Sequence, residues 1–239
     1  MKYMGSKRKY AKYILPIVLA GRKPGQWYVE PFVGGANMID KVDGNRIGAD
    51  INGYLPALYT ALQKGWTPPE TVTEEIYNAV KANPQIYPPE LVAFLGFACS
   101  YAAKWFGGWC RGFDNAGFPR DYIREGRDNV LAQAPKLAGI VFKHSGYFEL
   151  DIPENSIIYC DPPYCGTTKY KAAFDHWGFW NWCDEKVLHG HTVFVSEYSA
   201  PAGWRCVWEK EVFSSLDKNT GGKRGTERLF TKGLLDGLL

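Results

Sequence analysis

The sequence lacks the signatures of several common classes of protein. Its six cysteines form no CxxC pair and no dense spacing, which argues against a zinc site, a dithiol redox site or a disulfide scaffold. No apolar run approaches the length of a membrane span, and no signal peptide is recognisable. Neither GxGxxG nor GK[ST] occurs, which disfavours NAD and P-loop nucleotide sites. We therefore expect a cytoplasmic protein with reduced cysteines, no metal and no membrane partner.

An excess of one charge is also missing. The formal net charge is only +3, so bulk electrostatics permit a nucleic-acid partner without demanding one. The distribution of charge is more informative, because the segments 2–13 and 218–228 are both locally basic.

Strand-like and helix-like runs alternate along the chain. The length of 239 residues suits one α/β domain with an insert. Runs rich in β-branched and aromatic residues predict strands at 26–32, 46–51, 139–144, 156–161, 191–198, 206–213 and 224–231. Helices are expected near 7–21, shortened or kinked by Pro16, and over 52–65 and 177–188. This alternation predicts a doubly wound, mostly parallel sheet.

The middle of the chain has a different character. Residues 66–104 contain helical runs separated by proline-rich breaks. The following stretch, "WFGGWCRGFDNAGFPRDYIREGR" (105–127), is rich in glycine, aromatic residues and arginine. Such a composition does not suit a regular core element, so we expect a loop or hairpin that exposes aromatic and cationic groups.

Polar residues and glycines follow the first two predicted strands. Glu30 lies near the end of the first strand, the pair Gly34 and Gly35 follows it, and Asp50 ends the second. Ligands bind beyond the carboxyl ends of parallel strands, where glycines allow a close approach of the backbone. Asp50 comes about twenty residues after Glu30, the usual spacing for a carboxylate that binds ribose hydroxyls. Alone, the pattern could equally be a tight strand-to-helix turn.

The strand at 156–161 runs into Asp161, Pro162, Pro163 and Tyr164. Proline has a fixed φ and no N–H, and it keeps its predecessor out of the helical region. The segment is therefore expected to be rigid and extended, with the Asp161 carboxylate and the Pro162 carbonyl as two fixed acceptors. Tyr164 adds a flat surface for stacking.

Two acceptors beside an aromatic ring suit the exocyclic amine of a flat base. The lone pair of such an amine is delocalised into the ring, which makes it a poor nucleophile. Acceptors on both N–H bonds favour a tetrahedral amine and localise that lone pair, which is catalysis by electrostatic preorganisation and orientation.

Taken together, these motifs resemble the Dam-like DNA N6-adenine methyltransferases, especially their phage-borne members and those of restriction-modification systems. The motif order "KYMGSK", "EPFVGGANM", "YCDPPYCGTTKY", "FDHWGFWNWC", "VFVSEYSAP" and "KNTGGKRGTERLF" carries the resemblance over almost the whole chain. It implies a Rossmann-like, seven-stranded methyltransferase sheet in 1–53 and 137–239. A mainly helical target-recognition domain with a hairpin near 108–122 would occupy 54–136.

The resemblance also implies roles for individual residues. S-adenosylmethionine would be bound by Tyr3, Lys7, Glu30, Pro31, Phe32, Gly34, Gly35, Asp50 and Asp161, and Asp161, Pro162, Pro163 and Tyr164 would be catalytic. Many relatives carry an acid near the cofactor's adenine, where "KHSGYFEL" offers Ser145 and Gly146. Contact with that adenine could then come from Ser145, from Tyr147 or from the backbone.

Basic residues in two segments are candidates for contact with double-stranded DNA. These are Arg111, Arg120, Arg124, Lys218, Lys223 and Arg224. Arg111 and Arg120 are candidates for phosphate or guanine contacts, whereas Arg124 and Arg127 fit the solvated face of a helix equally well. We expect a monomer or weak dimer in the cytoplasm of a bacterium or a phage-infected host.

Three other functions remain open at this point. The same tetrapeptide could activate N4 of cytosine, and the chain could be a catalytically silent DNA-binding relative. Methylation of RNA or of a protein amide is disfavoured, because an Asn-headed tetrapeptide is more typical of those enzymes.

Overall fold

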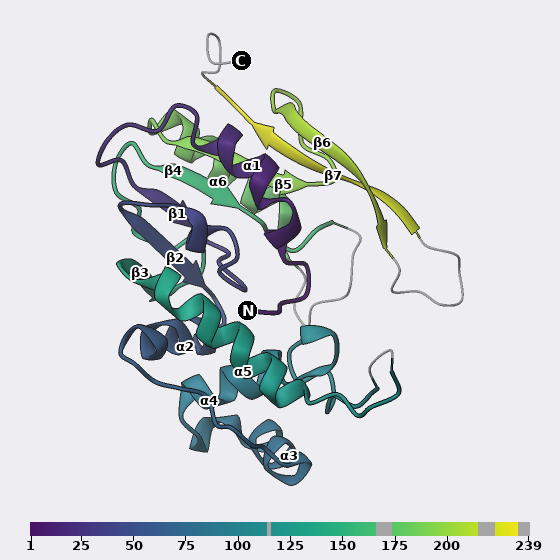
Figure 1. The fold of residues 1–239 in the computed structure, drawn as a ribbon. Coiled ribbons are helices and arrows are strands. Elements are labelled where there is room, and N and C mark those ends of the chain that lie inside the picture. Colours follow the sequence, from purple (N-terminus) through teal and green to yellow (C-terminus); the bar gives the residue numbers. More distant parts are fainter. Residues whose placement is uncertain (114–115, 166–173, 215–222, 234–239) are drawn as a thin grey trace.

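A seven-stranded sheet forms the centre of the computed structural model, which describes residues 1–113, 116–165, 174–214 and 223–233 (Figure 1). The strands are β1 (Tyr28–Glu30), β2 (Arg46–Asp50), β3 (Ile140–His144), β4 (Ile157–Cys160), β5 (Thr192–Glu197), β6 (Arg205–Ser214) and β7 (Lys223–Thr231). Their order is β3-β2-β1-β4-β5-β7-β6, with β1 to β5 parallel and β7 antiparallel to both of its neighbours. The predicted doubly wound, mostly parallel, seven-stranded sheet is confirmed.

The strand order reverses between β1 and β4. From β1 the chain builds outward through β2 to β3, and from β4 it builds in the opposite direction to β5. In open parallel sheets such a reversal creates a crevice at the carboxyl ends of the two central strands. The glycine turn follows β1 and the Asp161 tetrapeptide follows β4, so both motifs begin at this crevice.

Helices cover both faces of the sheet because alternate strand residues point to opposite sides. Tyr28, Tyr159 and Phe194 belong to one apolar layer, together with residues of α1 (Ala11–Val18) and α2 (Tyr54–Gln63). Val29, Ile158 and Val193 belong to the second layer, together with residues of α6 (His176–Leu188). None of the helices in the described ranges is long and apolar enough to cross a membrane.

The ends of several helices follow from local sequence. Pro16 lies inside α1, which is only eight residues long and follows a separate 3₁₀ turn. The helix is therefore shorter than the run 7–21, as the presence of Pro16 led us to expect. Asp121 accepts the backbone N–H of Arg124 at the start of α5 (Tyr122–Gln133), and Asp175 caps α6 in the same way through Gly178.

The inserted helices gather beyond β3 (Figure 1). They are α3 (Glu74–Ala82), α4 (Pro89–Ala93), the π-helical turn Phe94–Ala98, and α5. The helix α2, which begins the range proposed for target recognition, packs against α4 of the insert as well as against β2 and β3. The division into two domains remains a prediction.

The hairpin expected near 108–122 is irregular in the residues that the structure describes. In the part of this segment that the structure describes, Phe113 and Pro119 form one isolated antiparallel bridge. The backbone N–H of Arg120 also bonds the carbonyl of Gly112 at 3.0 Å. In the residues that the structure describes, the segment is a loop closed by single contacts, and its three glycines together with Pro119 disfavour an extended ladder of strands.

Candidate active site

The glycine turn after β1 lies against the amino-terminal arm. A Cβ atom at Gly34 would come within 2.8 Å of the Tyr3 ring, and one at Gly35 within 2.6 Å of the Tyr3 Cβ. Gly34 also has φ of +45°, and its carbonyl accepts a hydrogen bond from the Tyr59 hydroxyl at 2.5 Å. Both glycines are therefore required by close packing, and Tyr3, a predicted cofactor-binding residue, lies against this turn.

Asp50, at the end of β2, is bonded to the same turn. Its Oδ2 accepts the N–H of Gly34 at 3.0 Å, and its Oδ1 accepts the N–H of Asn52 at 2.9 Å. Burial raises the pKa of Asp50 to about 6, although these two hydrogen bonds oppose the rise. The Ser145 N–H bonds the Asp50 carbonyl at 3.2 Å, which places Ser145 beside Asp50.

Glu30, Pro31 and Phe32 lead into the turn and are held within the protein. Glu30 is only 3% exposed and accepts the Tyr28 hydroxyl at 2.7 Å, and burial raises its pKa well above the ordinary value. Pro31 is buried, and the Phe32 ring packs against Tyr147 at a centroid distance of 5.4 Å.

Lys7 meets the tetrapeptide after β4. Its Nζ lies 3.0 Å from Asp161 Oδ1 and 4.5 Å from the centroid of the Tyr164 ring. The lysine side chain is only 6% exposed, so its charge is balanced inside the protein. Burial raises the pKa of Asp161, and the nearby Lys7 partly offsets that rise. Ser6 supports this placement by capping the 3₁₀ turn Lys7–Lys9.

Two acids that the sequence analysis missed complete this region. Glu227, on β7, accepts the Tyr164 hydroxyl at 2.8 Å and lies 3.5 Å from Lys7 Nζ. Glu197, at the end of β5, accepts the N–H of Cys165 at 2.7 Å and that of Tyr198 at 2.5 Å. Its position at a strand end, like that of Asp50, was a usable signal.

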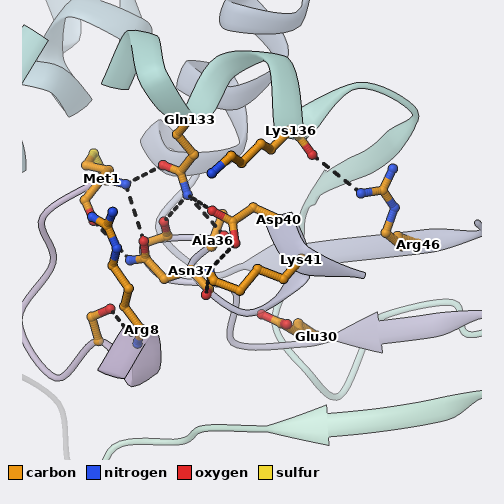
Figure 2. Close-up of polar contacts among 12 residues, drawn as sticks. Met1, Arg8, Glu30, Ala36, Asn37, Asp40, Lys41, Arg46, Gln133 and Lys136 are labelled. Carbon is orange, nitrogen blue, oxygen red and sulfur yellow. Dashed lines mark hydrogen bonds and ion pairs between the residues drawn. The ribbon is translucent and has the colours of Figure 1, made fainter. Parts of the chain in front are cut away.

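A third missed residue joins the glycine turn to the insert. Gln133, in the last turn of α5, donates through Nε2 to the carbonyls of Gly35 and Ala36, both at 3.1 Å (Figure 2). The same nitrogen lies 2.9 Å from the Asp40 carboxylate. The helix that follows the arginine-rich loop therefore ends on the turn that follows β1.

The candidate DNA-binding arginines lie in different settings. Arg120 makes two hydrogen bonds to the carboxylate of Glu125, at 2.8 and 2.6 Å, and Lys2 Nζ reaches the same carboxylate at 2.6 Å. Hydrogen bonds from Arg120 and then Lys2 lower the pKa of Glu125 to about 2. Arg120 thus neighbours the amino-terminal arm that carries Tyr3 and Lys7.

The remaining candidates show less organisation. Arg111 pairs with Glu74, and Arg124 is largely exposed on α5, 4.0 Å from Asp128. Lys218 lies outside the described residues. Lys223 and Arg224 begin β7, and their side chains also fall outside the described part.

Comparison with known proteins agrees with these motifs. Residues 3–90 match the family of D12 class N6 adenine-specific DNA methyltransferases. DNA adenine methylases from two strains of Vibrio cholerae serotype O1 are each 28% identical over 155 residues, which cover 57% of this chain and 55% of each relative. The chain thus spans about half the length of the curated relatives it matches. The resemblance to Dam-like adenine methyltransferases is confirmed.

Solved structures give a looser likeness. A proposed methyltransferase from Thermoplasma acidophilum has a TM-score of 0.37 and 10% identity, covering 92% of this chain and 73% of that chain. A second proposed methyltransferase, SMU.472, complexed with SAH, has a TM-score of 0.38 and 12% identity, covering 95% of this chain and 52% of that chain. The order of the seven strands itself defines the fold.

Proposed function

We propose that this Dam-like chain transfers the methyl group of S-adenosylmethionine to N6 of a flipped-out adenine in double-stranded DNA. The observation that carries the proposal is the placement of Asp161 and Tyr164 at the carboxyl end of β4, next to the glycine turn after β1. Sites for a methyl donor and a flat amine would then share one crevice.

The residues around the glycine turn fit the donor. A carboxylate offers about four acceptor positions, so Asp50 can still receive ribose hydroxyls while it holds two backbone N–H groups. Ile51 is 79% exposed and Phe148 is 69% exposed, and these apolar side chains follow β2 and β3 at the same edge of the sheet. Both suit the flat adenine of the cofactor. Bound there, S-adenosylmethionine would supply an electrophilic methyl group on a sulfonium centre.

The tetrapeptide supplies the remaining requirements. A duplex buries N6 of adenine, so the base must be rotated out at a cost of about a few kcal/mol. Stacking on the Tyr164 ring would return roughly 1–3 kcal/mol. Asp161 and the Pro162 carbonyl would then accept the two N–H bonds of the amine and aim its lone pair at the methyl group. After transfer, the surplus proton leaves to Asp161 or to water.

A transfer assay with labelled methyl donor and duplex DNA tests the proposal. We expect Asp161→Ala to abolish transfer and to leave duplex binding largely unchanged, whereas Asp151→Ala, at a 96% exposed side chain, should behave as wild type. A rate near wild type for Asp161→Ala would overturn the mechanism. Nucleoside analysis of the product separates N6-methyladenine from N4-methylcytosine, and no transfer by wild type would indicate a silent DNA-binding protein.

A further inference from the structure

Three charged side chains, including that of Asp161 in the tetrapeptide, form a compact cluster. Lys7 Nζ lies 3.0 Å from Asp161 Oδ1 and 3.5 Å from Glu227 Oε2. The side chains are 6%, 22% and 14% exposed respectively, so little water screens them. With both acids ionised, one lysine neutralises only one of the two carboxylates, and the cluster keeps one negative charge.

The groups around this cluster add little compensating charge. The phenols of Tyr159 and Tyr164 have pKa values raised well above the ordinary value by burial, so both stay neutral. Burial likewise raises the pKa of Glu30 well above its ordinary value, which disfavours its charged form. Glu197 lies on β5, next to β7, with the His176 ring 3.9 Å from its carboxylate. Burial also raises the pKa values of Tyr10 and Tyr198, the remaining neighbours, which favours their neutral forms.

We infer that Glu227 gives the methyl-transfer site its negative charge and thereby makes it prefer the cationic donor S-adenosylmethionine over the neutral product S-adenosylhomocysteine. This inference rests on the proposed function. Among the described residues, Glu227 contacts the site through Lys7 and Tyr164, so it acts by its charge and by positioning these two residues.

The charge balance of the reaction explains why such a preference would be useful. Before transfer, the sulfonium carries one positive charge beside Asp161. The C–S bond then breaks, its electron pair stays on sulfur, and the new N–C bond moves the positive charge to the amine, which loses a proton. The remaining thioether is neutral, so the attraction that held the donor is absent from the product. Glu227 would therefore favour entry of the donor and release of the product.

The variant Glu227→Gln removes the charge and keeps the shape. A glutamine oxygen can still accept the Tyr164 hydroxyl, so the ring retains its hydrogen bond. One unit charge acting over several ångströms in a partly buried site changes affinity by about tenfold. We expect calorimetry near about pH 8, which favours ionised carboxylates, to show about tenfold weaker binding of S-adenosylmethionine. The affinity for S-adenosylhomocysteine should change less than about twofold, because its neutral thioether has no charge for Glu227 to attract.

Two further variants make the result decisive. Glu227→Asp keeps the charge and should keep the wild-type ratio of the two dissociation constants, even if it lowers the melting temperature. Glu211→Gln removes an exposed acid from the same hairpin, on β6, and should leave both constants unchanged.

The outcomes separate this inference from the proposed function. If wild-type protein binds neither ligand, the proposed function fails. If wild type binds both, and Glu227→Gln weakens both equally or neither, the charge role of Glu227 is wrong while the proposed function stands. A selective loss of affinity for the cationic donor supports the inference.

Discussion

Asp50 Oδ2 accepts the backbone N–H of Gly34 at 3.0 Å, so the acid that ends β2 also holds the turn that follows β1. This contact joins two elements that the resemblance had assigned to one ligand. An acid that fixes the turn and binds the ribose would connect the ionisation of one side chain to the shape of the whole cofactor site.

The first prediction concerns the pH dependence of cofactor binding. Ribose hydroxyls and the Gly34 N–H both donate to an ionised carboxylate, and burial raises the pKa of Asp50 to about 6. S-adenosylmethionine should therefore bind with constant affinity above that value and about tenfold more weakly for each pH unit below it. Calorimetric titrations from about pH 8 down to about pH 5 would measure this change.

Asp50→Asn provides the control for this experiment. It should bind the cofactor weakly at every pH, without the break near the pKa of Asp50. His144 is the neighbouring group whose charge lowers that pKa, so His144→Gln should move the break upward. A break that persists unchanged in Asp50→Asn would assign the titration to another residue.

The second prediction concerns the link from α5 to the glycine turn. Gln133→Ala leaves the carbonyls of Gly35 and Ala36 without their side-chain donor and should cost roughly 1–3 kcal/mol of stability. Because these carbonyls belong to the turn, the dissociation constant of S-adenosylmethionine should also rise, by about fivefold for each kcal/mol lost at the site.

Gln63 on α2 offers a matched comparison. It also donates to two backbone carbonyls, but that of Leu137 ends the 3₁₀ turn after α5 and that of Ile140 begins β3, so neither belongs to the glycine turn. Gln63→Ala should lower the melting temperature and leave cofactor affinity unchanged. Equal cofactor affinities in the two variants would show that Gln133 has only a structural role.

Much of the fold could be predicted from the sequence because its signals are local. The runs ending at Asp50 and Asp161 combine β-branched residues with an abrupt polar stop, and each is a strand in the structure. Glycines that permit close packing marked the turn at Gly34 and Gly35 in the same way. Since parallel strands end at one edge, these local patterns also placed most of the site.

The missed residues depend on contacts between distant parts of the chain. Glu227 lies in the middle of an antiparallel strand, and its place beside Lys7 follows from β7 lying next to β5. Gln133 looks like any polar residue near a helix end, and only the packing of α5 brings it to the turn. The irregular form of the hairpin near 108–122 has a similar cause, because the contacts between its two sides, such as the bridge of Phe113 and Pro119, are not encoded by composition.

The third prediction concerns the ring of Tyr164. Tyr164→Ala removes the proposed stacking surface and should weaken insertion of the flipped base by roughly 1–3 kcal/mol. Tyr164→Phe keeps the ring and loses the hydroxyl with its hydrogen bond to Glu227, so it should retain most of that stacking. Fluorescence of 2-aminopurine at the target position reports unstacking of the base. The expected order of base insertion is wild type, then Phe, then Ala, and equal signals from Phe and Ala would remove the ring from base binding.

The last prediction concerns Arg120 and the reading of DNA. In this structure Arg120 is held by Glu125, which also binds Lys2, so removing Arg120 leaves the contact between Lys2 and Glu125 in place. Arg120→Ala should therefore leave S-adenosylmethionine affinity unchanged and alter DNA recognition. If Arg120 contacts a guanine, the variant should lose roughly 1–3 kcal/mol of binding free energy at one base position of the target. If it contacts a phosphate, binding should weaken equally for all sequences, and the slope of log affinity against log salt concentration should fall by about one.

Arg124 supplies the comparison for this test. It lies four residues further along, at the start of α5, and its side chain is 79% exposed with Asp128 at 4.0 Å. If it belongs to the solvated face of the helix, Arg124→Ala should bind and methylate DNA as wild type does. Methylation measured across a library of duplex targets, at two salt concentrations, separates base reading from phosphate contact. If Arg120→Ala instead binds the cofactor more weakly and keeps the wild-type target preference, the 105–127 segment lies outside the DNA interface. Arg120 would then serve to position the arm that carries Tyr3 and Lys7.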